Sequence, residues 1–301
     1  MRKAAAFAPG HITGLFQICD SPSDPLLRGS RGAGVSISQG VYTSVAAEPA
    51  DETHVTIRIN GAVTHEANVS ENVLAKMLPR MTQPHRIEVD HTIETPLGSG
   101  FGSSGGGAVT LSLALNEVLG LGMTRIEASR VAHVAEIECK TGLGTVYAAL
   151  VAGFGVLIKA GGPGVGKSIK YDDPSRLRLV YIHFGPISTS QALSDPIIKA
   201  RINDLGGGFV EKMASDLSPE LFMRLARRFT DHVGLATPRL RRVFRSADEA
   251  GVPSAMAMFG EVAFTLIDRE RADEAAAVFE SAAQGHEAVI VGVDNEPARL
   301  V

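Results

Sequence analysis

Glycine and serine residues that could bind a phosphate group are concentrated in one segment, Pro96 to Ala108, which reads PLGSGFGSSGGGA. Glycines let a backbone approach a polyphosphate closely, and the free N–H groups and dipole at a helix start attract an anion. The segment follows a strand-like pattern and runs into a helical one. We therefore predict a phosphate-binding loop here, in preference to a flexible turn.

A second segment, Gly161 to Ser168, reads GGPGVGKS and satisfies the Walker A pattern GxxxxGK[ST]. A working P-loop continues into a helix at its Lys and Ser. Here Pro174 follows after a few residues, and the strand-like LRLVYIHF comes next. We predict a chance match in a loop between domains, with a P-loop NTPase as the alternative.

Glu136 is the carboxylate best placed for a role in catalysis. In a helix from Arg125 to Cys139 it shares a stripe with small apolar residues three, four or seven positions apart, namely Ala128, Ala132, Ala135 and Cys139. A carboxylate on such a face is costly unless it is paired or bound to a cation. The alternative is a Glu at the edge of the stripe that reaches solvent. Glu138 lies roughly 200° away around the helix, so the two cannot hold one ion.

The elements that position these residues are strands before the glycine-rich segment and helices after it. Arg86 to Ile93 alternates apolar and polar residues, as a half-buried strand does, and Asn60 with Gly61 predicts a hairpin turn. Further strands are predicted at Lys3 to Phe7, Val35 to Val45, Val55 to Ile59 and Gly155 to Lys159. One helix is predicted from Ser103 to Leu119. A second begins after Thr124, which forms a capping-box pattern with Glu127.

The second half repeats the mixture of strands and helices. Strands are predicted at Leu179 to Phe184, Ala255 to Met258, Val262 to Ile267 and Ala288 to Val293, with helices from about Asp195 to Ala250 and Glu270 to Ala283. Seven arginines between Arg224 and Arg245 are expected mainly on solvated helix faces. We predict an α+β fold of two domains, 1–166 and 167–301, divided at the Gly- and Pro-rich stretch.

Composition excludes some classes of function. A chain of 301 residues is long enough for two domains, and a net charge of −4 argues against nucleic acid as a partner. Cys19 and Cys139 lack the spacing of a metal site, and no segment has the apolar length of a membrane span. We expect a cytoplasmic protein with a small-molecule partner, which could form a homodimer.

The glycine-rich segment resembles the central motif of the GHMP kinases, commonly written PxxxGLGSSAA, with Phe101 in place of Leu. FAPGHITGLFQI, Phe7 to Ile18, resembles the first motif of that family, and SAMAMFGEV, Ser254 to Val262, loosely resembles the third. Within the family, the HITG continuation is similar to pantoate kinases. So are two further segments, GSRGAGV at Gly29 to Val35 and AHVAEIECKTGLG at Ala132 to Gly144.

The resemblance implies an N-terminal domain with the ATP loop, a C-terminal ferredoxin-like domain, and an active site in the cleft between them. It places ATP on Pro96, Gly98, Gly100, Gly102, Ser103, Ser104, Gly105 and Gly106. It makes Ser104 and Glu136 the Mg²⁺ ligands, with Glu136 and Thr145 as catalytic residues. For the acceptor it indicates Gly10, His11, Thr13 and Arg31, with His11 and Arg31 as donors to a carboxylate.

Thr145 departs from the family pattern, because many GHMP kinases have an Asp after the turn that follows this helix. Phosphoryl transfer depends chiefly on positioning and charge stabilisation, so the absence of a base does not exclude catalysis. The implied reaction is ATP-dependent phosphorylation of pantoate to 4-phosphopantoate in coenzyme A biosynthesis. The alternatives are another acceptor, such as homoserine, shikimate or mevalonate, and an inactive nucleotide-binding regulator.

Overall fold

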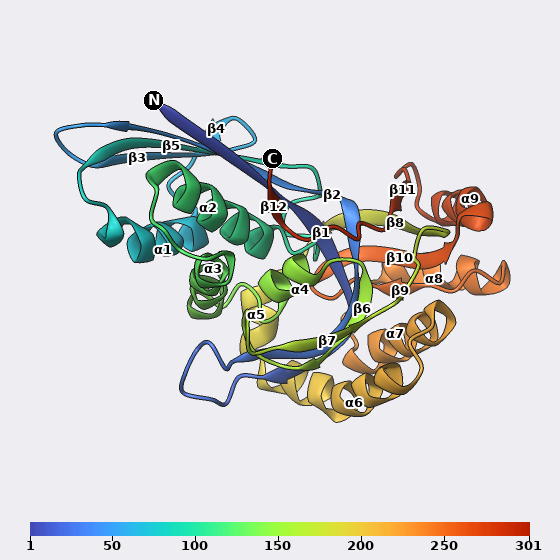
Figure 1. The fold of residues 1–301 in the computed structure, drawn as a ribbon. Helices are drawn as coiled ribbons and strands as arrows, with labels where there is room; N and C mark the ends of the chain where they lie inside the picture. Colours follow the sequence, from blue (N-terminus) through green and yellow to red (C-terminus); the bar gives the residue numbers. More distant parts are fainter.

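Two long strands, β1 (Arg2–Cys19) and β2 (Gly29–Pro49), form the spine of the first sheet in the computed structural model, which describes residues 1–301 (Figure 1). They pair antiparallel along almost their whole length, with register shifts at Pro9/Gly10 and Thr13/Leu15. Such irregularities bend a strand and re-aim its side chains. The segment that resembles the first GHMP motif therefore lies in a bulged strand.

The remaining strands of this sheet come from both ends of the chain. They are β3 (His54–Ile59), β4 (Ala62–Val63), β5 (His85–Ile93), β6 (Phe154–Lys159), β7 (Lys167–Lys170) and β12 (Arg299–Leu300). The order is β12-β1-β2-β5-β3-β4, while β6 pairs with β2 and β7 with β6. The predicted hairpin turn is confirmed, because Asn60 and Gly61 have φ of 48° and 82° between β3 and β4.

Four helices cover one face of the first sheet: α1 (Asn68–Met77), α2 (Ser103–Leu119), α3 (Arg125–Cys139) and α4 (Thr145–Val151) (Figure 1). A short 3-10 helix, η1 (Leu78–Arg80), follows α1. The capping box at α3 is confirmed, since the Thr124 N–H donates to Glu127 Oε2 (2.7 Å) and the Glu127 N–H donates to Thr124 Oγ1 (3.2 Å). Helix α2 ends at Gly120, which has a φ of 61°. Helices α1 and α4 were not predicted from the sequence.

The second sheet has four strands in the order β11-β8-β10-β9, all antiparallel: β8 (Leu177–Pro186), β9 (Ala255–Met256), β10 (Gly260–Asp268) and β11 (Val289–Gly292). Counted along the chain this is 4-1-3-2, the order of a ferredoxin-like sheet. Its helices are α5 (Thr189–Ser194), α6 (Pro196–Ser215), α7 (Pro219–Val233), α8 (Pro238–Glu249) and α9 (Ala272–Ala282), with η2 (Arg269–Arg271) before α9. The predicted α+β architecture is confirmed.

Aromatic side chains join the two halves in one large core. Phe154 of β6 lies 5.2 Å from Phe222 of α7 between ring centroids, and Phe16 of β1 lies 6.0 Å from Phe229. The first sheet is completed by β7, which begins at Lys167, and by β12, which pairs with β1. Segments from beyond residue 166 thus belong to both sheets. None of the helices has the length and apolar character needed to cross a bilayer, and both cysteines are free.

Candidate active site

The glycine-rich segment connects β5 to α2 through three glycines with left-handed backbone. Gly98, Gly100 and Gly102 have φ of 67°, 80° and 69°. Gly102 precedes α2, no side chain caps this helix, and the first intrahelical bond runs from the Gly106 N–H to the Gly102 carbonyl (3.0 Å). The N–H groups of the first three residues, Ser103 to Gly105, therefore point out of the helix start without a helical partner. This is the geometry that binds an anion.

A turn from the second sheet supports the loop from behind. A Cβ on Gly100 would lie 2.7 Å from the Met258 carbonyl oxygen, and a Cβ on Gly260 would lie 1.9 Å from the Ser99 carbonyl oxygen. The Met258 N–H also donates to the Thr13 carbonyl (3.1 Å). The segment that resembles the third GHMP motif therefore packs directly on the glycine-rich loop and on β1, and glycine is needed where the backbones meet.

Glu136 lies buried beneath the start of α2. The Ser104 hydroxyl donates to Glu136 Oε1 (3.1 Å), whereas Oε2 has no hydrogen-bond partner. Burial raises the pKa of this carboxyl to about 7, although the Ser104 hydroxyl and the Val146 amide favour its charged form. A Cβ on Gly142 would lie 2.4 Å from Oε1, and one on Gly105 would lie 2.8 Å from it. The two glycines make room for the carboxylate.

These residues fit a Mg²⁺ ion. In sites that act on nucleoside phosphates, Mg²⁺ takes only one or two ligands from the protein and the rest from phosphate oxygens and water. Ser104 and Glu136 present a hydroxyl and an unpaired buried carboxylate oxygen beside the free N–H groups of α2. No cluster of three or more His, Cys, Asp or Glu side chains offers a different metal site.

Thr145 faces the glycine-rich loop from the first turn of α4. A Cβ on Gly102 would lie 2.3 Å from Thr145 Cγ2, and a Cβ on Gly105 would lie 2.8 Å from Thr145 Cβ. The site thus brings Gly102, Ser104, Glu136 and Thr145 together from the loop, α2, α3 and α4. Thr145 therefore presents a hydroxyl at the position where the family resemblance led us to expect an Asp.

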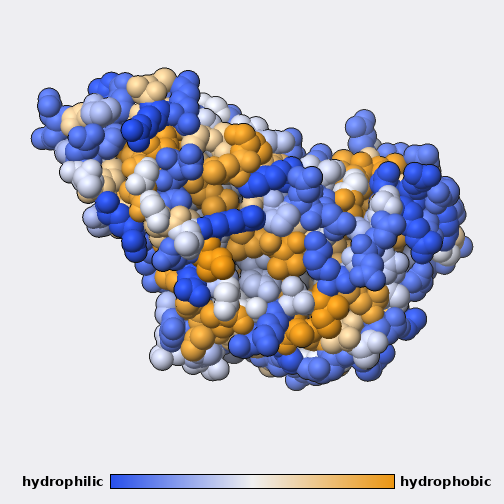
Figure 2. Space-filling model, viewed as in Figure 1, coloured by the Kyte–Doolittle hydropathy of each residue, from blue (hydrophilic) through white to orange (hydrophobic).

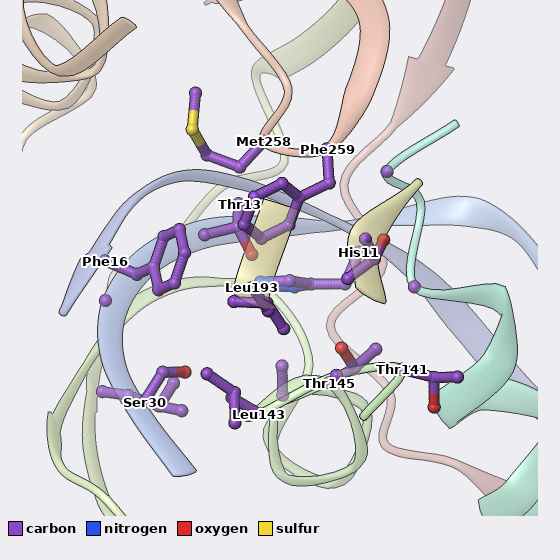
Figure 3. A pocket seen from close by; sticks show the side chains of 18 of the residues that line it. His11, Thr13, Phe16, Ser30, Thr141, Leu143, Thr145, Leu193, Met258 and Phe259 are labelled. Atoms are coloured by element: carbon purple, nitrogen blue, oxygen red, sulfur yellow. The ribbon is translucent and has the colours of Figure 1, made fainter. Parts of the chain in front are cut away.

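A cavity opens next to this cluster at the junction of the two halves (Figure 3). It is a small cavity of about 100 Å³ that is partly open to solvent. Polar groups that line it come from His11, Thr13, Ser30, Thr141, Thr145 and Thr189, whereas Phe16, Leu143, Leu157, Leu193, Met258 and Phe259 supply apolar surface. None of its lining residues is Asp, Glu, Lys or Arg. In Figure 2, uncharged and apolar residues occupy much of the middle of the molecule.

His11 and Thr13, which were expected to bind the acceptor, both line the cavity, but His11 is not a cation there. Burial lowers the pKa of His11 to about 4, so its ring is neutral near pH 7. Its Nδ1 is hydrogen-bonded to Ser36 Oγ (3.3 Å), and Gly34 leaves space for the ring, because a Cβ there would lie 2.4 Å from Nε2. His11 can therefore offer an N–H to an acceptor, but not a positive charge.

Arg31 and Gly10 do not line the cavity. Ser30, Gly32 and Ala33 of β2 line the cavity and Arg31 does not, because its side chain is directed toward β1 and α6. There its guanidinium donates to Gln17 Oε1 (2.9 Å) and pairs with Glu211 Oε1 (2.6 Å). Gly10 lies at a bulge, where a Cβ would lie 2.9 Å from the Gln39 carbonyl oxygen.

Sequence reasoning missed Ser30 and the apolar residues Leu143 and Leu193. Alternation along the SRGAG strand puts Ser30 and Arg31 on opposite faces, so it offered Ser30 as the alternative to Arg31. Leu143 lies in the TGLG turn of the segment that resembles pantoate kinases, which could have indicated it, whereas nothing in the local sequence marks Leu193.

The Walker-like segment is a packing loop. The Gly162 N–H donates to the Leu26 carbonyl (2.9 Å), and the N–H groups of Val165 and Gly166 both donate to the Gly162 carbonyl (2.9 and 3.0 Å). Arg130 of α3 donates to the Pro163 carbonyl (3.0 Å). Lys167 begins strand β7, so the prediction that no helix follows this motif is confirmed. The N–H groups of Gly162, Val165 and Gly166 are therefore occupied within the protein.

Residues 67–153 match the family described as the GHMP kinases N terminal domain. The pantoate kinase of Thermococcus kodakarensis is 34% identical over 276 residues, which cover 90% of this chain and 89% of the relative. The pantoate kinase of Methanocaldococcus jannaschii is 30% identical over 275 residues, which cover 91% and 97%.

Solved structures agree with this grouping. A structure titled a phosphotransferase related to the CoA biosynthesis pathway superposes with a TM-score of 0.90 at 31% identity, over 99% of this chain and 98% of that one. The homoserine kinase of Cytophaga hutchinsonii shares the fold, with a TM-score of 0.70 at 18% identity over 100% of this chain and 98% of that one. With the open helix start, the buried Glu136 and the adjoining cavity, these likenesses show that the chain belongs to the GHMP kinase family.

Proposed function

We propose that the chain transfers the γ-phosphoryl group of ATP to the 4-hydroxyl of pantoate, giving ADP and 4-phosphopantoate, a step of coenzyme A biosynthesis. The observation that carries this is the cavity, which is lined by hydroxyl and imidazole groups together with apolar side chains, and which reaches Gly100 and Gly102 of the glycine-rich loop. Relatives that span about nine-tenths of the chain are pantoate kinases.

The phosphates of ATP are proposed to lie on the loop from Pro96 to Gly102 and on the start of α2. The uncapped N–H groups of Ser103, Ser104 and Gly105 would bind the anionic oxygens, aided by the helix dipole. The Gly106 N–H is already bonded to Gly102, and a Cβ on Gly106 would lie 3.1 Å from Val41. Gly106 therefore contributes close packing beneath the loop.

Ser104 and Glu136 are the residues that would hold Mg²⁺. When bound, the ion neutralises charge on the phosphate oxygens during transfer. Glu136 offers the unpaired Oε2 for this purpose, and the Ser104 hydroxyl, which now donates to Oε1, would turn its oxygen toward the ion. Glu136 must be ionised to act as a ligand, and a neighbouring cation favours that form.

Pantoate carries a carboxylate, two hydroxyls and a geminal dimethyl group, and the cavity offers a partner for each. Hydroxyls of Thr13 and Ser30 and the N–H of His11 can donate to the carboxylate, while Leu143 faces the methyl groups. Thr145 lies beside Gly102 and would orient the 4-hydroxyl toward the γ-phosphorus. With no carboxylate among the lining residues, the hydroxyl proton would leave to a phosphate oxygen or to water.

A coupled ADP-release assay with pantoate, pantothenate, homoserine, shikimate and mevalonate tests this assignment. We expect Mg²⁺-dependent turnover with pantoate far above that with the other acceptors. Turnover confined to another acceptor would reject pantoate and retain the kinase. ATP binding without turnover of any acceptor would favour the regulatory alternative that the hydroxyl at residue 145 suggests.

A further inference from the structure

We propose that Leu193 of α5 determines acceptor specificity, by closing the apolar side of the cavity so that acceptors with a branched apolar body are preferred. This inference rests on the proposed function and extends it to a residue of the second half of the chain. Leu193 lines the cavity and lies between Thr13 and Leu143 in Figure 3.

Helix α5 presents one face to the cavity and the other to solvent. Thr189 and Leu193, four residues apart, both line the cavity, whereas Ser190 and Ser194 are exposed. Leu193 and Leu143 are both partly buried and pack against the large core cluster. Leu193 is thus held at the wall, with its side chain available to a bound molecule.

The position of α5 is tied to the nucleotide loop. The Ile187 N–H, just before α5, donates to the Gly98 carbonyl (3.2 Å), and the Asp195 side chain caps the following helix, α6, by accepting from the Ile197 N–H (2.8 Å). The helix is therefore fixed at both ends. These contacts fix the position of Leu193 relative to the glycine-rich loop, where phosphoryl transfer is proposed to occur.

An apolar wall can discriminate between acceptors only by their apolar parts. One methylene group in a hydrophobic pocket changes kcat/KM by roughly 10- to 200-fold. Pantoate and 2,4-dihydroxybutanoate share the carboxylate and both hydroxyls, and differ only in the two methyl groups on C3. The ratio of kcat/KM for these two acceptors therefore measures what the apolar wall contributes to specificity. Interactions with ATP and with the carboxylate are common to both acceptors, so their contributions cancel in the ratio.

The experiment compares this ratio in the wild-type protein, Leu193→Ala, Leu193→Val and Leu193→Met. The matched control is Leu205→Ala, which shortens a partly buried leucine of α6 that does not line the cavity. We expect Leu193→Ala to lower the ratio by about 10-fold and Leu193→Val by roughly 3-fold, because each shortened side chain loses contacts with the two methyl groups that only pantoate has. Leu193→Met and Leu205→Ala should keep the ratio, and KM for ATP should stay within about 2-fold throughout.

An unchanged ratio in folded Leu193→Ala and Leu193→Val would overturn the inference. A rise in KM for ATP with an unchanged acceptor ratio would also overturn it, since Leu193 would then contribute to ATP binding and not to the choice of acceptor. If the wild-type protein turned over neither acceptor while binding ATP, the proposed function itself would fail and the inference would fall with it. The last result is recognised in the wild-type protein alone, before any variant is compared.

Discussion

Glu136 is placed where a carboxylate is costly to the fold. It is 1% exposed, its Oε2 has no partner, and burial raises its pKa to about 7. A buried polar atom without a partner destabilises the native state, so a residue kept in that condition is a candidate for a role in chemistry. The Ser104 hydroxyl and the Val146 amide offset this cost only in part.

Substitutions at the two proposed Mg²⁺ ligands should affect catalysis much more than the stability of the fold. We expect Glu136→Gln and Ser104→Ala each to lower kcat by about 100-fold or more, because each removes a ligand of the ion that bridges the phosphates. Glu136→Gln should leave the thermal unfolding midpoint of the protein without Mg²⁺ unchanged or higher, since a neutral amide replaces a buried acid. Steady-state kinetics across a Mg²⁺ titration, with calorimetric unfolding, provide the test. Near wild-type turnover in Glu136→Gln would show that it is not a ligand.

His91 gives a prediction about pH and stability. It is buried, its Nδ1 is hydrogen-bonded to Thr43 Oγ1 (2.7 Å) and its Nε2 to Ser70 Oγ (3.0 Å). Burial lowers its pKa from 6.5 to about 4, although Asp90 acts in the opposite direction. Between those values the unfolded chain binds the proton and the native one does not. The contribution of His91 is therefore complete above pH 6.5 and is lost as the pH falls toward 4.

Urea unfolding at pH 7 and pH 5 measures this contribution. From the two pKa values we expect His91 to account for about 2 kcal/mol of the loss in unfolding free energy between these pH values. His91→Gln should be less stable than the wild-type protein at pH 7, because its network is incomplete, but should lose less on acidification. An equal loss in both proteins would contradict a neutral buried His91.

At the scale of elements, sequence patterns predicted those whose signals are local. The alternation of Arg86 to Ile93 and the capping box at Thr124 need no tertiary information, and both predictions are confirmed. Strands β7 and β12 have four and two residues, and they are fixed by pairing with β6 and β1. Such pairings join residues far apart in the chain, so a local pattern could not predict them.

In the site too, residues marked by a local pattern could be predicted, whereas those that depend on strand pairing could not. Gly102, Ser104 and Glu136 were recognised because a loop and a helix stripe put them in context, and the structure brings them together. The expectation that Arg31 serves the acceptor did not take account of the face of β2 on which it lies. That face depends on register, and a shift of one residue would reverse it.

The two glycine-rich segments can be told apart by mutation. Gly102→Val should nearly abolish ATP binding, because φ is 69° there and a Cβ would lie 2.3 Å from Thr145 Cγ2. Lys167→Ala should leave ATP affinity within a few fold, since this exposed residue begins a strand. Loss of a true P-loop contact would cost about 1.5–3 kcal/mol, on the order of ten- to a hundred-fold.

Calorimetric titration of ATP into the folded variants decides between them. Gly122→Val is the matched control, because Gly122 has a φ of 68° and nothing within 4 Å of an added Cβ. It should bind ATP normally. Binding lost in Lys167→Ala and kept in Gly102→Val would favour the P-loop interpretation over the GHMP one.

At the scale of the whole molecule, an ion pair in the second half supports the turn beneath the nucleotide loop. Glu261, with a side chain 9% exposed, accepts from Arg239 Nε (3.0 Å) and Nη2 (2.7 Å) and from Thr237 Oγ1 (2.5 Å). The Arg239 side chain itself is 47% exposed, as expected for the arginines of this region, so the buried member of the pair is Glu261. Glu261 directly follows Gly260, whose backbone contacts Ser99 of the loop.

Breaking this pair should destabilise the protein. We expect Arg239→Ala to lower the free energy of unfolding by about 1–3 kcal/mol, because it leaves a buried carboxylate with one hydroxyl partner. The double variant Arg239→Ala with Glu261→Gln should recover part of that loss, as seen in urea unfolding. Arg242→Ala, at an exposed position on the same helix, is the control. Equal stability of Arg239→Ala and Arg242→Ala would mean that the pair contributes little.

The cavity lies where both halves of the chain meet, and its lining residues come from β1, β2 and the turn before α4 as well as from α5 and the Met258 turn. The most direct test of the central claim is the identity of the product formed from ATP and pantoate. Phosphorus NMR of the reaction mixture should show one new phosphate ester coupled to two methylene protons, formed in equal amount with ADP, as expected for transfer to the 4-hydroxyl. Coupling to a single methine proton, or release of inorganic phosphate without an ester, would contradict the account.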